Sequence, residues 1–272
     1  MKQMQAVPLT SRAWRRPIHS WLRIFILLFL HFVFAFVVLL AIYPFVNTDG
    51  RMRLYAHWCR KFLKITGVTV FRFGSEIADR GSLLVANHVS LLDVYVLNSC
   101  HPASSLAKKE VRKWPVVGWM ASRLETVFID RSNKRQVIEC IVEISEKMRS
   151  RISFWVFPEG TRSRDGVKKF RSAIFQAAID SSSPVYPVSV FYPSMSKTSN
   201  SEFDAQESDF KSILKMLHTM RRPTVYVFVG AAIGGQGKRD EYAAWAEQAV
   251  KEGYERLRVS ADVKLAELEA NR

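Results

Sequence analysis

The stretch LVANHVSLLD contains a histidine and an aspartate, five positions apart, whose side chains could together carry out proton transfer. The imidazole of His88 can take a proton from a substrate, and the Asp93 carboxylate can stabilise the imidazolium that forms. Residues three or four apart meet on a helix, whereas residues five apart lie about 140° apart around its axis. The two side chains can therefore meet only if the chain bends between them.

The residues around this pair predict such a bend. SLLVA (82–86) has the composition of a buried strand, and Ser90 and Asp93 have the Ser-x-x-acid spacing of a helix start. His88 would then precede the helix, with Asp93 in its first turn. Spacing alone leaves two interpretations open: Asp93 only caps the helix, or it orients a histidine base. Because the chain has no G-x-S-x-G nucleophile elbow and no suitably placed cysteine, a base at His88 would take its proton from a substrate hydroxyl.

A second candidate site is FPEGTRS (157–163), which directly follows a predicted buried strand. Its proline and glycine indicate a turn at the strand's carboxyl end, where α/β proteins gather their ligand sites. Five basic residues against two acids within residues 157–171 suit a phosphate group. A solvated charged loop would have the same composition.

Two further segments carry weaker signals. TVFIDR (126–131) ends a predicted strand in Asp130 and Arg131, so its guanidinium either contacts a ligand at the strand end or forms a surface ion pair. The two prolines of SPVYPVSV (183–190) shape the entry to another strand. A structural role and a functional role of these prolines would require the same backbone geometry, so the two interpretations are nearly the same here.

The composition indicates a folded protein with an anionic partner. The 272 residues are 48% hydrophobic and 24% charged, which is ordinary for a globular chain. The formal net charge of +15 is not ordinary, and it predicts a polyanionic partner such as nucleic acid, anionic lipid or a phosphorylated substrate. The three cysteines show no C-x-x-C pairing, which argues against a disulfide framework or a zinc site.

Residues 24–46 indicate that, among these possible anionic partners, lipid is favoured. They form a run of 23 nearly uninterrupted apolar residues, broken only by His31. A helix of this length is about 34 Å long, enough to cross a bilayer core. A cleaved signal would be shorter and would end at a small-residue site, and a buried soluble helix is the third interpretation. We expect a membrane anchor, which favours anionic lipid over nucleic acid as the partner.

The sequences that flank the apolar run bear on its insertion. Five basic residues and no acid precede it, which places the N-terminus in the cytoplasm by the positive-inside rule. After the turn residues 47–50, RMRLYAHWCRKFLKI (51–65) has the basic and aromatic mixture of an interfacial amphipathic helix. We expect residues 1–66 to form a membrane-anchoring helical hairpin that enters one leaflet and keeps both ends cytoplasmic. A single full crossing is the alternative.

From residue 67 onward, short apolar segments alternate with helical ones. Several apolar segments are unbroken, as in strands buried on both faces of a parallel sheet. We therefore expect residues 67–272 to form an α/β domain with a largely parallel central sheet flanked by helices. The predicted strands are residues 68–73, 82–86, 105–107, 126–129, 153–157, 185–190 and 224–230. The predicted helices lie near residues 90–99, 111–121, 132–150, 170–180, 206–220 and 239–266, and residues 193–210 are predicted as a surface loop.

Taken together, these motifs resemble those of the glycerolipid acyltransferase family, specifically the 1-acylglycerol-3-phosphate acyltransferases. NHVSLLD matches the family's N-H-x-x-x-x-D block, VFIDR matches most of its second block, FPEGTRS matches its third, and PVYPVSV resembles its fourth. AKKEVRKWPVVGWMA (107–121) is also similar to the family's connecting segment. The resemblance covers residues 67–230, and four blocks in the right order and spacing make it specific.

The resemblance implies a membrane enzyme that moves a fatty acyl chain from acyl-CoA or acyl-carrier protein to the free hydroxyl of a lysolipid. His88 would be the general base, Asp93 would orient it, and the hydroxyl would attack the thioester directly, without an acyl-enzyme. The implied substrate-binding residues are Arg131, Glu159, Gly160, Thr161 and Arg162 for the acceptor, with Lys108 and Lys109 at the phosphoryl or thioester end. The resemblance implies no metal or redox cofactor and no nucleic acid, and it places the site at the cytoplasmic face of the inner membrane.

Two departures from the family's pattern bear on the acceptor. Arg123-Leu124-Glu125 stands where the second block often opens with glycine, and Ser172 lies at or near the place of a glycine that often follows the third block. The expected acceptor is 1-acylglycerol-3-phosphate, which would give phosphatidic acid. A lyso-ornithine lipid or another lysophospholipid is the alternative. The competing classes are a membrane hydrolase, in which water replaces the acceptor, and a non-enzymatic, basic, membrane-anchored binding protein.

Overall fold

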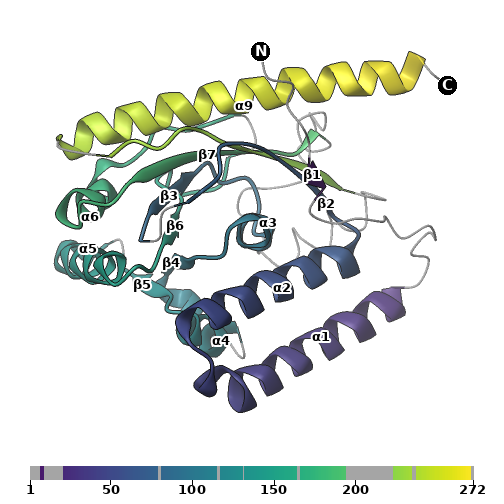
Figure 1. Ribbon diagram of the computed structural model, residues 1–272, viewed down its shortest axis with the longest axis horizontal. Coiled ribbons are helices and arrows are strands. Elements are labelled where there is room, and N and C mark those ends of the chain that lie inside the picture. The colour runs from purple at the N-terminus through teal and green to yellow at the C-terminus, as the bar shows by residue number, and fades with distance from the viewer. Residues whose placement is uncertain are drawn as a thin grey trace.

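The computed structural model is built around one eight-stranded sheet with helices on both faces (Figure 1). It describes residues 7–8, 21–78, 81–114, 117–130, 132–163, 166–193, 223–234 and 237–270. The strands are β1 (Val7–Pro8), β2 (Thr69–Gly74), β3 (Leu83–Ala86), β4 (Ser104–Lys108), β5 (Val127–Ile129), β6 (Phe154–Val156), β7 (Val185–Phe191) and β8 (Thr224–Val229). The α-helices are α1 (Trp21–Ala41), α2 (Thr48–Thr66), α3 (Leu92–Cys100), α4 (Val117–Arg123), α5 (Lys134–Arg149), α6 (Phe175–Asp180) and α9 (Arg239–Ala270), and the 3₁₀ turns are η1 (Tyr43–Phe45), η2 (Lys109–Lys113) and η3 (Ser172–Ile174).

Five adjacent strands of the sheet run in the same direction. The strand order is β1-β2-β8-β7-β3-β6-β4-β5, and the pairs β7–β3, β3–β6, β6–β4 and β4–β5 are all parallel. β8 is antiparallel to β7 and parallel to β2, so these two strands run the other way. The prediction of an α/β fold with a largely parallel sheet is confirmed, and the carboxyl ends of five strands meet at one edge.

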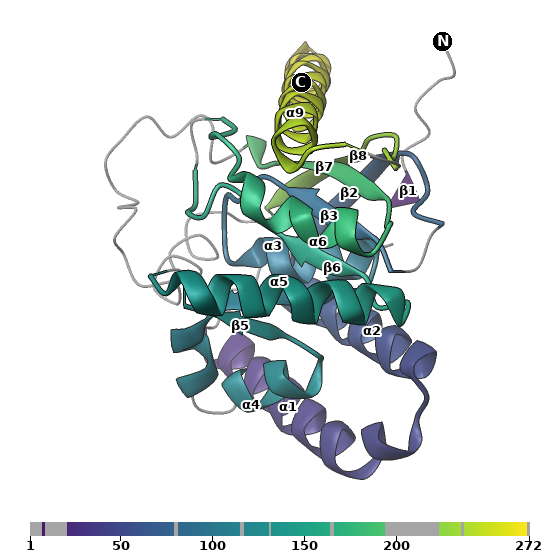
Figure 2. The ribbon, with the colours of Figure 1, turned by 90° about the vertical axis from the view of Figure 1, so that its left-hand side faces the viewer.

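Strand β3 shows why an unbroken apolar sequence belongs inside such a sheet. All four of its side chains are buried. Leu84 and Ala86 pack in the core beneath α2 and α3, whereas Leu83 and Val85 pack in the core formed with α5, α6 and α9. Figures 1 and 2 show the resulting layers: α9, α5 and α6 on one side of the sheet, α3 and α2 on the other, and α1 outside α2.

The predicted elements differ from the observed ones mainly at helices. Each of the seven predicted strands is present within two residues of its expected bounds, and β1 was not predicted. The single helix predicted near 111–121 is wrong, because the chain forms η2 and then α4. A Cβ on Gly118 would lie 2.2 Å from the Arg112 carbonyl oxygen, so this glycine permits the close approach of α4 to η2. The helix predicted at 206–220 and the loop predicted at 193–210, beyond Pro193, lie outside the described residues.

Helices α1 and α2 fold back on each other through η1. The Asn47 side chain accepts a hydrogen bond from the Gly50 N–H at 2.9 Å and so begins α2, and Gly67 ends it with a φ of 74°. Between the two helices, the ring of His31 stacks on that of Trp58 at 5.1 Å. None of the helices in the described part of the chain is both long and apolar enough to cross a membrane.

The apolar side of α2 faces protein. Phe62 stacks on Tyr95 of α3 with ring centroids 3.9 Å apart, and Trp58 contacts the same tyrosine as well as α1. The aromatic residues that suggested an interfacial helix therefore join the hairpin to the domain. The exposed apolar surface of the hairpin lies instead on α1 and η1, where Phe29 is 68% and Phe45 is 86% exposed.

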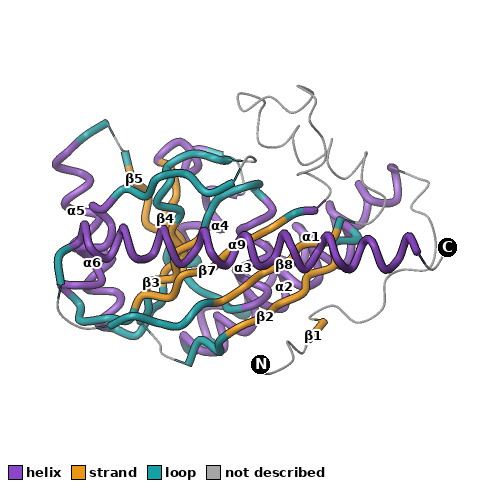
Figure 3. The backbone as a smooth tube through the Cα atoms, turned by 90° about the horizontal axis from the view of Figure 1, so that it is seen from above, coloured by secondary structure: helices purple, strands orange, loops and turns teal. Residues whose placement is uncertain are grey.

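Helix α9 lies across β7 and β8, as seen from above in Figure 3, and a glycine sets how closely it approaches. The Ser189 hydroxyl donates to the Val250 carbonyl of α9 at 2.8 Å. A Cβ on Gly253 would lie 2.3 Å from Ser189 Oγ and 2.9 Å from Cδ1 of Phe228. Any side chain at Gly253 would thus push the helix off the sheet.

We therefore expect Gly253→Ala to destabilise the protein, although alanine favours a helix over glycine by about 1 kcal/mol. Overpacking of this kind typically costs about 1–3 kcal/mol, which should lower the Tm by roughly 2–8 °C in a chain of this size. Thermal unfolding followed by circular dichroism measures the effect. Gly234→Ala is the matched control, since a Cβ there would meet no atom within 4 Å. An unchanged Tm for Gly253→Ala would contradict the tight packing.

Candidate active site

The His88 and Asp93 side chains meet, as the bend between β3 and α3 requires. Nδ1 of His88 lies 2.8 Å from Oδ2 of Asp93. The Asp93 side chain is fully buried, whereas the His88 side chain is 19% exposed. His88 lies in the turn that follows β3, and Asp93 lies in the first turn of α3. A carboxylate can only accept hydrogen bonds, so Nδ1 carries the proton and Nε2 is the nitrogen that can act as a base.

The Asp93 carboxylate is held by hydrogen bonds to both of its oxygens. Oδ2 accepts from the backbone N–H of Val89 at 2.7 Å and of Ser90 at 2.9 Å, in addition to the imidazole of His88. Oδ1 accepts from the Tyr192 hydroxyl at 2.6 Å. Four donors offset the cost of burying this charge and fix the carboxylate in place.

The start of α3 reconciles the two interpretations that the sequence left open. The helix begins at Leu92, and the residue before it, Leu91, makes no side-chain cap. Ser90 nevertheless makes the capping contacts that its spacing predicted, because its Oγ accepts from the Leu92 N–H at 3.3 Å and its own N–H donates to Oδ2 of Asp93 at 2.9 Å. The Asp93 carboxylate bonds the N–H groups ahead of the helix from within its first turn. One side chain thus shapes the turn and orients the imidazole.

Two residues of this site were missed in the sequence. Tyr192 directly follows β7, and burial together with the charge of Asp93 raises the pKa of its hydroxyl well above the usual value, so it remains a donor. Asn87 is 1% exposed, and its side chain exchanges two hydrogen bonds with the backbone of Val190, at 2.8 and 2.9 Å. Both lie where β3 and its parallel neighbour β7 end, so a search for polar residues at strand ends would have found them.

The loop after β6 packs directly against the histidine. The ring of Phe157 stacks on that of His88 with centroids 4.1 Å apart. The Ser163 N–H donates to the His88 carbonyl at 2.7 Å. The turn between them is closed by the Gly160 N–H, which donates to the Phe157 carbonyl at 3.2 Å, and Gly160 has a φ of 76°. The adjacency of β3 and β6 thus joins the first and third motifs of the sequence into one site.

Glu159 points into the protein beneath this loop. It is 4% exposed, and its Oε1 accepts from the Lys168 N–H at 3.3 Å. Its buried Oε2 has no hydrogen-bond partner within the described residues. Burial raises the pKa of Glu159 to about 8, although the backbone N–H groups of Lys168 and His88 oppose the shift. A carboxyl so placed lies beside the backbone of His88 and away from the surface of the loop.

The other predicted residues of this loop are on its outer side. Thr161 is exposed, while Gly160 and Arg162 are partly exposed. The Lys168 ammonium donates to the Arg162 carbonyl at 3.2 Å and so brings a second positive charge to the loop. This basic surface belongs to the loop that packs against His88, and its two positive charges suit a phosphate.

The remaining predicted residues gather around the ends of β4 and β5. Lys108 ends β4 and Lys109 begins η2, and the Lys109 ammonium lies 3.7 Å from Oδ2 of Asp130. Hydrogen bonds from Ser132, and then the Lys109 charge, hold the pKa of Asp130 below its usual value. The two lysines are separated from His88 by β6. Arg131 lies outside the described residues.

Within the described residues, the site therefore combines a histidine whose Nδ1 contacts the Asp93 carboxylate with a basic surface on the neighbouring loop. A base without an enzyme nucleophile can act only on a hydroxyl or water that the ligand supplies. Fold and site define an α/β protein with a His–Asp pair at the carboxyl edge of a parallel sheet.

Comparisons with known proteins identify the family. Residues 65–191 match the family described as Acyltransferase. A lyso-ornithine lipid O-acyltransferase of Pseudomonas aeruginosa is 31% identical over 212 residues, which cover 75% of this chain and 79% of that protein. The chain therefore belongs to the acyltransferase family.

Two further relatives support this placement. The 1-acyl-sn-glycerol-3-phosphate acyltransferase of Neisseria gonorrhoeae is 30% identical over 164 residues, covering 60% of this chain but only 64% of that protein's length. The crystal structure of the 1-acyl-sn-glycerophosphate acyltransferase PlsC of Thermotoga maritima superposes with a TM-score of 0.66 over 87% of this chain and 94% of that one. Its sequence is 24% identical, so this likeness shows the fold alone.

The raised pKa of Glu159 predicts a pH-dependent stability that Glu159→Gln should remove. Between its ordinary pKa of 4.5 and its folded pKa of about 8, the native state holds a proton that the unfolded chain releases. The contribution of the protonated Glu159 to the free energy of unfolding is then fully present below pH 4.5, and it is lost as the pH rises through that window. We expect the free energy of unfolding of the wild type, relative to Glu159→Gln, to fall by up to about 1.4 kcal/mol per pH unit there.

Urea unfolding at several pH values between about 5 and 9 measures this difference. Glu110→Gln, on the exposed turn η2, is the control and should show no such trend. A difference between the wild type and Glu159→Gln that is constant with pH would mean that Glu159 is ionised throughout, as an acceptor-binding carboxylate would be.

Proposed function

We propose that this protein is a membrane-attached O-acyltransferase that moves a fatty acyl chain from acyl-CoA or acyl-carrier protein to the free hydroxyl of a lysolipid. The observation that carries the proposal is the 2.8 Å contact between His88 Nδ1 and the fully buried Asp93. We infer that Nε2 acts as the base and that the nucleophile is the hydroxyl of the acceptor. Membership of the acyltransferase family supports the reaction class.

In the proposed reaction, His88 Nε2 takes the proton of the acceptor hydroxyl as its oxygen attacks the thioester carbonyl carbon. The new C–O bond forms, the C–S bond breaks, and the imidazolium returns the proton to the leaving thiolate. Asp93 stabilises the imidazolium while that charge exists, and the Tyr192 hydroxyl and two backbone N–H groups keep the carboxylate fixed. No acyl-enzyme is formed.

The acceptor's phosphate would bind the outer side of the loop after β6. Arg162 and the nearby ammonium of Lys168 supply charge, Thr161 supplies a hydroxyl donor, and Gly160 forms the tight turn of the loop. Arg131 is assigned to the same phosphate by the family resemblance, and Lys108 and Lys109 to the phosphoryl or thioester end. Glu159 is better suited to support the backbone of His88, because its carboxyl is buried.

Two acceptors have specific support. The sequence motifs favour 1-acylglycerol-3-phosphate, and the Neisseria relative is named for that activity. The Pseudomonas relative, which matches a longer part of this chain, is named as a lyso-ornithine lipid O-acyltransferase. We propose 1-acylglycerol-3-phosphate as the principal acceptor because the loop after β6 is basic, and a phosphomonoester carries more negative charge than an ornithine head group.

Attachment to the cytoplasmic face of the inner membrane would occur through α1. One side of this helix, including His31, Ala35 and Leu39, packs against the protein, and the opposite side is apolar and exposed. The Lys61 ammonium lies 5.8 Å from the ring of Phe34, so positive charge borders this apolar surface. An apolar strip flanked by basic residues is typical of a helix that lies in the surface of an anionic membrane.

We expect His88→Ala to lower acceptor-dependent acylation by at least about 10²-fold, because positioned acid–base catalysis is typically worth that much. The measurement is thiol release from acyl-CoA by the purified protein, with and without 1-acylglycerol-3-phosphate. Asn133→Ala, at the start of α5 on the far side of β4 and β6 from His88, is a control for general loss of stability.

The same assay distinguishes the competing functions. Thiol release that does not need an acceptor would favour a hydrolase, and no release with any lysolipid would favour a non-enzymatic binding protein. Faster acylation of a lyso-ornithine lipid than of 1-acylglycerol-3-phosphate would replace the proposed acceptor with the alternative one.

The role proposed for α1 predicts that Phe29→Ser combined with Leu30→Ser weakens binding to lipid vesicles by at least about tenfold, because burial of each side chain contributes roughly 1.5–3 kcal/mol. The two side chains are 68% and 54% exposed, so the Tm should not change. Vesicle co-sedimentation measures the binding. The matched control is Ile138→Ser with Val142→Ser, two exposed residues of α5. Equal losses in both pairs would contradict attachment through α1.

A further inference from the structure

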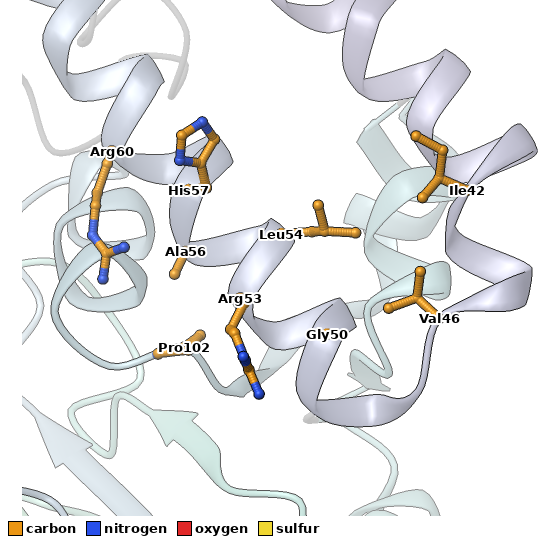
Figure 4. A pocket seen from close by; sticks show the side chains of 9 residues that line it. All are labelled: Ile42, Val46, Gly50, Arg53, Leu54, Ala56, His57, Arg60 and Pro102. Carbon is orange, nitrogen blue, oxygen red and sulfur yellow. The ribbon is translucent and has the colours of Figure 1, made fainter.

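A groove on the outer side of α2 has no role in the site described above (Figure 4). It has a volume of about 690 Å³ and runs between the η1 connection and the chain before β4. We call it the α2 groove. Its lining residues are Ile42, Val46, Gly50, Arg53, Leu54, Ala56, His57, Arg60 and Pro102.

The α2 groove lies at the opposite edge of the sheet from the catalytic pair. Pro102 precedes β4, whereas His88 follows β3, and these two strands run parallel on either side of β6. Helix α3 spans the distance between them: Asp93 is in its first turn and Ser99 in its last. A ligand in the α2 groove would thus bind away from the reacting groups.

The charged side chains that line the groove are all basic. Arg53 is exposed, and Figure 4 shows it beside Pro102, on the same side of α2 as Arg60. Arg60 is held in place by its Nε, which donates to the Ser99 carbonyl at the end of α3 at 3.0 Å. A guanidinium has two further nitrogens that can donate, so Arg60 offers a fixed anion-binding group on the same side of α2 as the exposed Arg53.

The other part of the groove is apolar. Leu54 of α2 faces Ile42 and Val46, which belong to the connection between the hairpin helices. The neighbouring Phe45 in the same connection is apolar as well and is 86% exposed. A ligand that fits must therefore carry a negative charge and an apolar chain in the same molecule.

We propose that the α2 groove binds one anionic phospholipid of the membrane, with its phosphate between Arg53 and Arg60 and its acyl carbons against Leu54 and Ile42. The proposal rests on the membrane attachment proposed for α1. It adds a lipid site that is separate from the acceptor site. Such a site would make attachment depend on the charge of the head group as well as on the exposed apolar surface of α1.

The test compares binding of the full-length protein to vesicles of phosphatidylcholine alone and of phosphatidylcholine mixed with phosphatidylglycerol. We expect Arg53→Gln combined with Arg60→Gln to weaken binding to the mixed vesicles about 25-fold, since each basic residue near an anionic surface contributes about fivefold. Binding to phosphatidylcholine alone should not change. The control pair, Arg135→Gln with Arg258→Gln, removes the same charge from exposed positions of α5 and α9 and should have little effect.

A second measurement separates a discrete lipid site from diffuse attraction. Titration calorimetry with short-chain phosphatidylglycerol, below the concentration at which it aggregates, should show saturable binding that is lost in the Arg53 and Arg60 pair and retained in the control pair. Leu54→Ser, which leaves the charge unchanged, should weaken it as well, and inorganic phosphate should not compete. If loss of the Arg60–Ser99 bond impairs folding, the single variant Arg53→Gln, which keeps that bond, provides the same test.

The outcomes also separate this proposal from the proposed function. If the wild type binds no vesicles, attachment through α1 fails and the α2 groove with it. If the wild type binds but both charge pairs lose affinity equally, or if phosphate displaces the lipid, only the lipid site is overturned.

Discussion

The hydrogen bonds to the Asp93 carboxylate are the interaction on which the rest of the site depends. Its two oxygens bind the imidazole of His88, two backbone N–H groups of the turn, and the hydroxyl of Tyr192. A buried charge with fewer donors would be costly, and loss of a single partner typically costs about 1–3 kcal/mol. The same bonds that stabilise the turn therefore decide which nitrogen of His88 carries a proton.

Parallel strand pairing provides the second constraint. Because β7, β3, β6, β4 and β5 all end at one edge, polar residues from distant parts of the sequence are brought together there without any long loop. β3 supplies the histidine, β7 the tyrosine, and β6 the basic loop that packs on the imidazole. The hairpin is outside this arrangement, and α2 connects it to the domain through aromatic contacts with α3.

The sequence predicted the strands well because buried parallel strands are unbroken apolar segments, and β3 and β6 are fully buried. It predicted the His88–Asp93 contact only through the resemblance to the acyltransferase family, because the spacing alone left a simple helix cap as the alternative. It did not predict Tyr192 or Asn87, since their partners lie about a hundred residues away and no local pattern records the order of strands in a sheet. It also gave no indication that Glu159 points inward, because burial depends on how the loop after β6 folds over the turn that precedes α3.

The position of Tyr192 has a consequence for the assembly of the protein. The segment that matches the acyltransferase family ends at residue 191, one residue before this tyrosine. β7 also has to insert between β3 and β8, and α9 then covers it. The His88–Asp93 pair is local in sequence, but its environment is completed only by long-range contacts, which are slow to form and costly in chain entropy. A nascent chain whose family segment had just left the ribosome would contain every motif and still lack the hydrogen bond from Tyr192 to Oδ1 of Asp93.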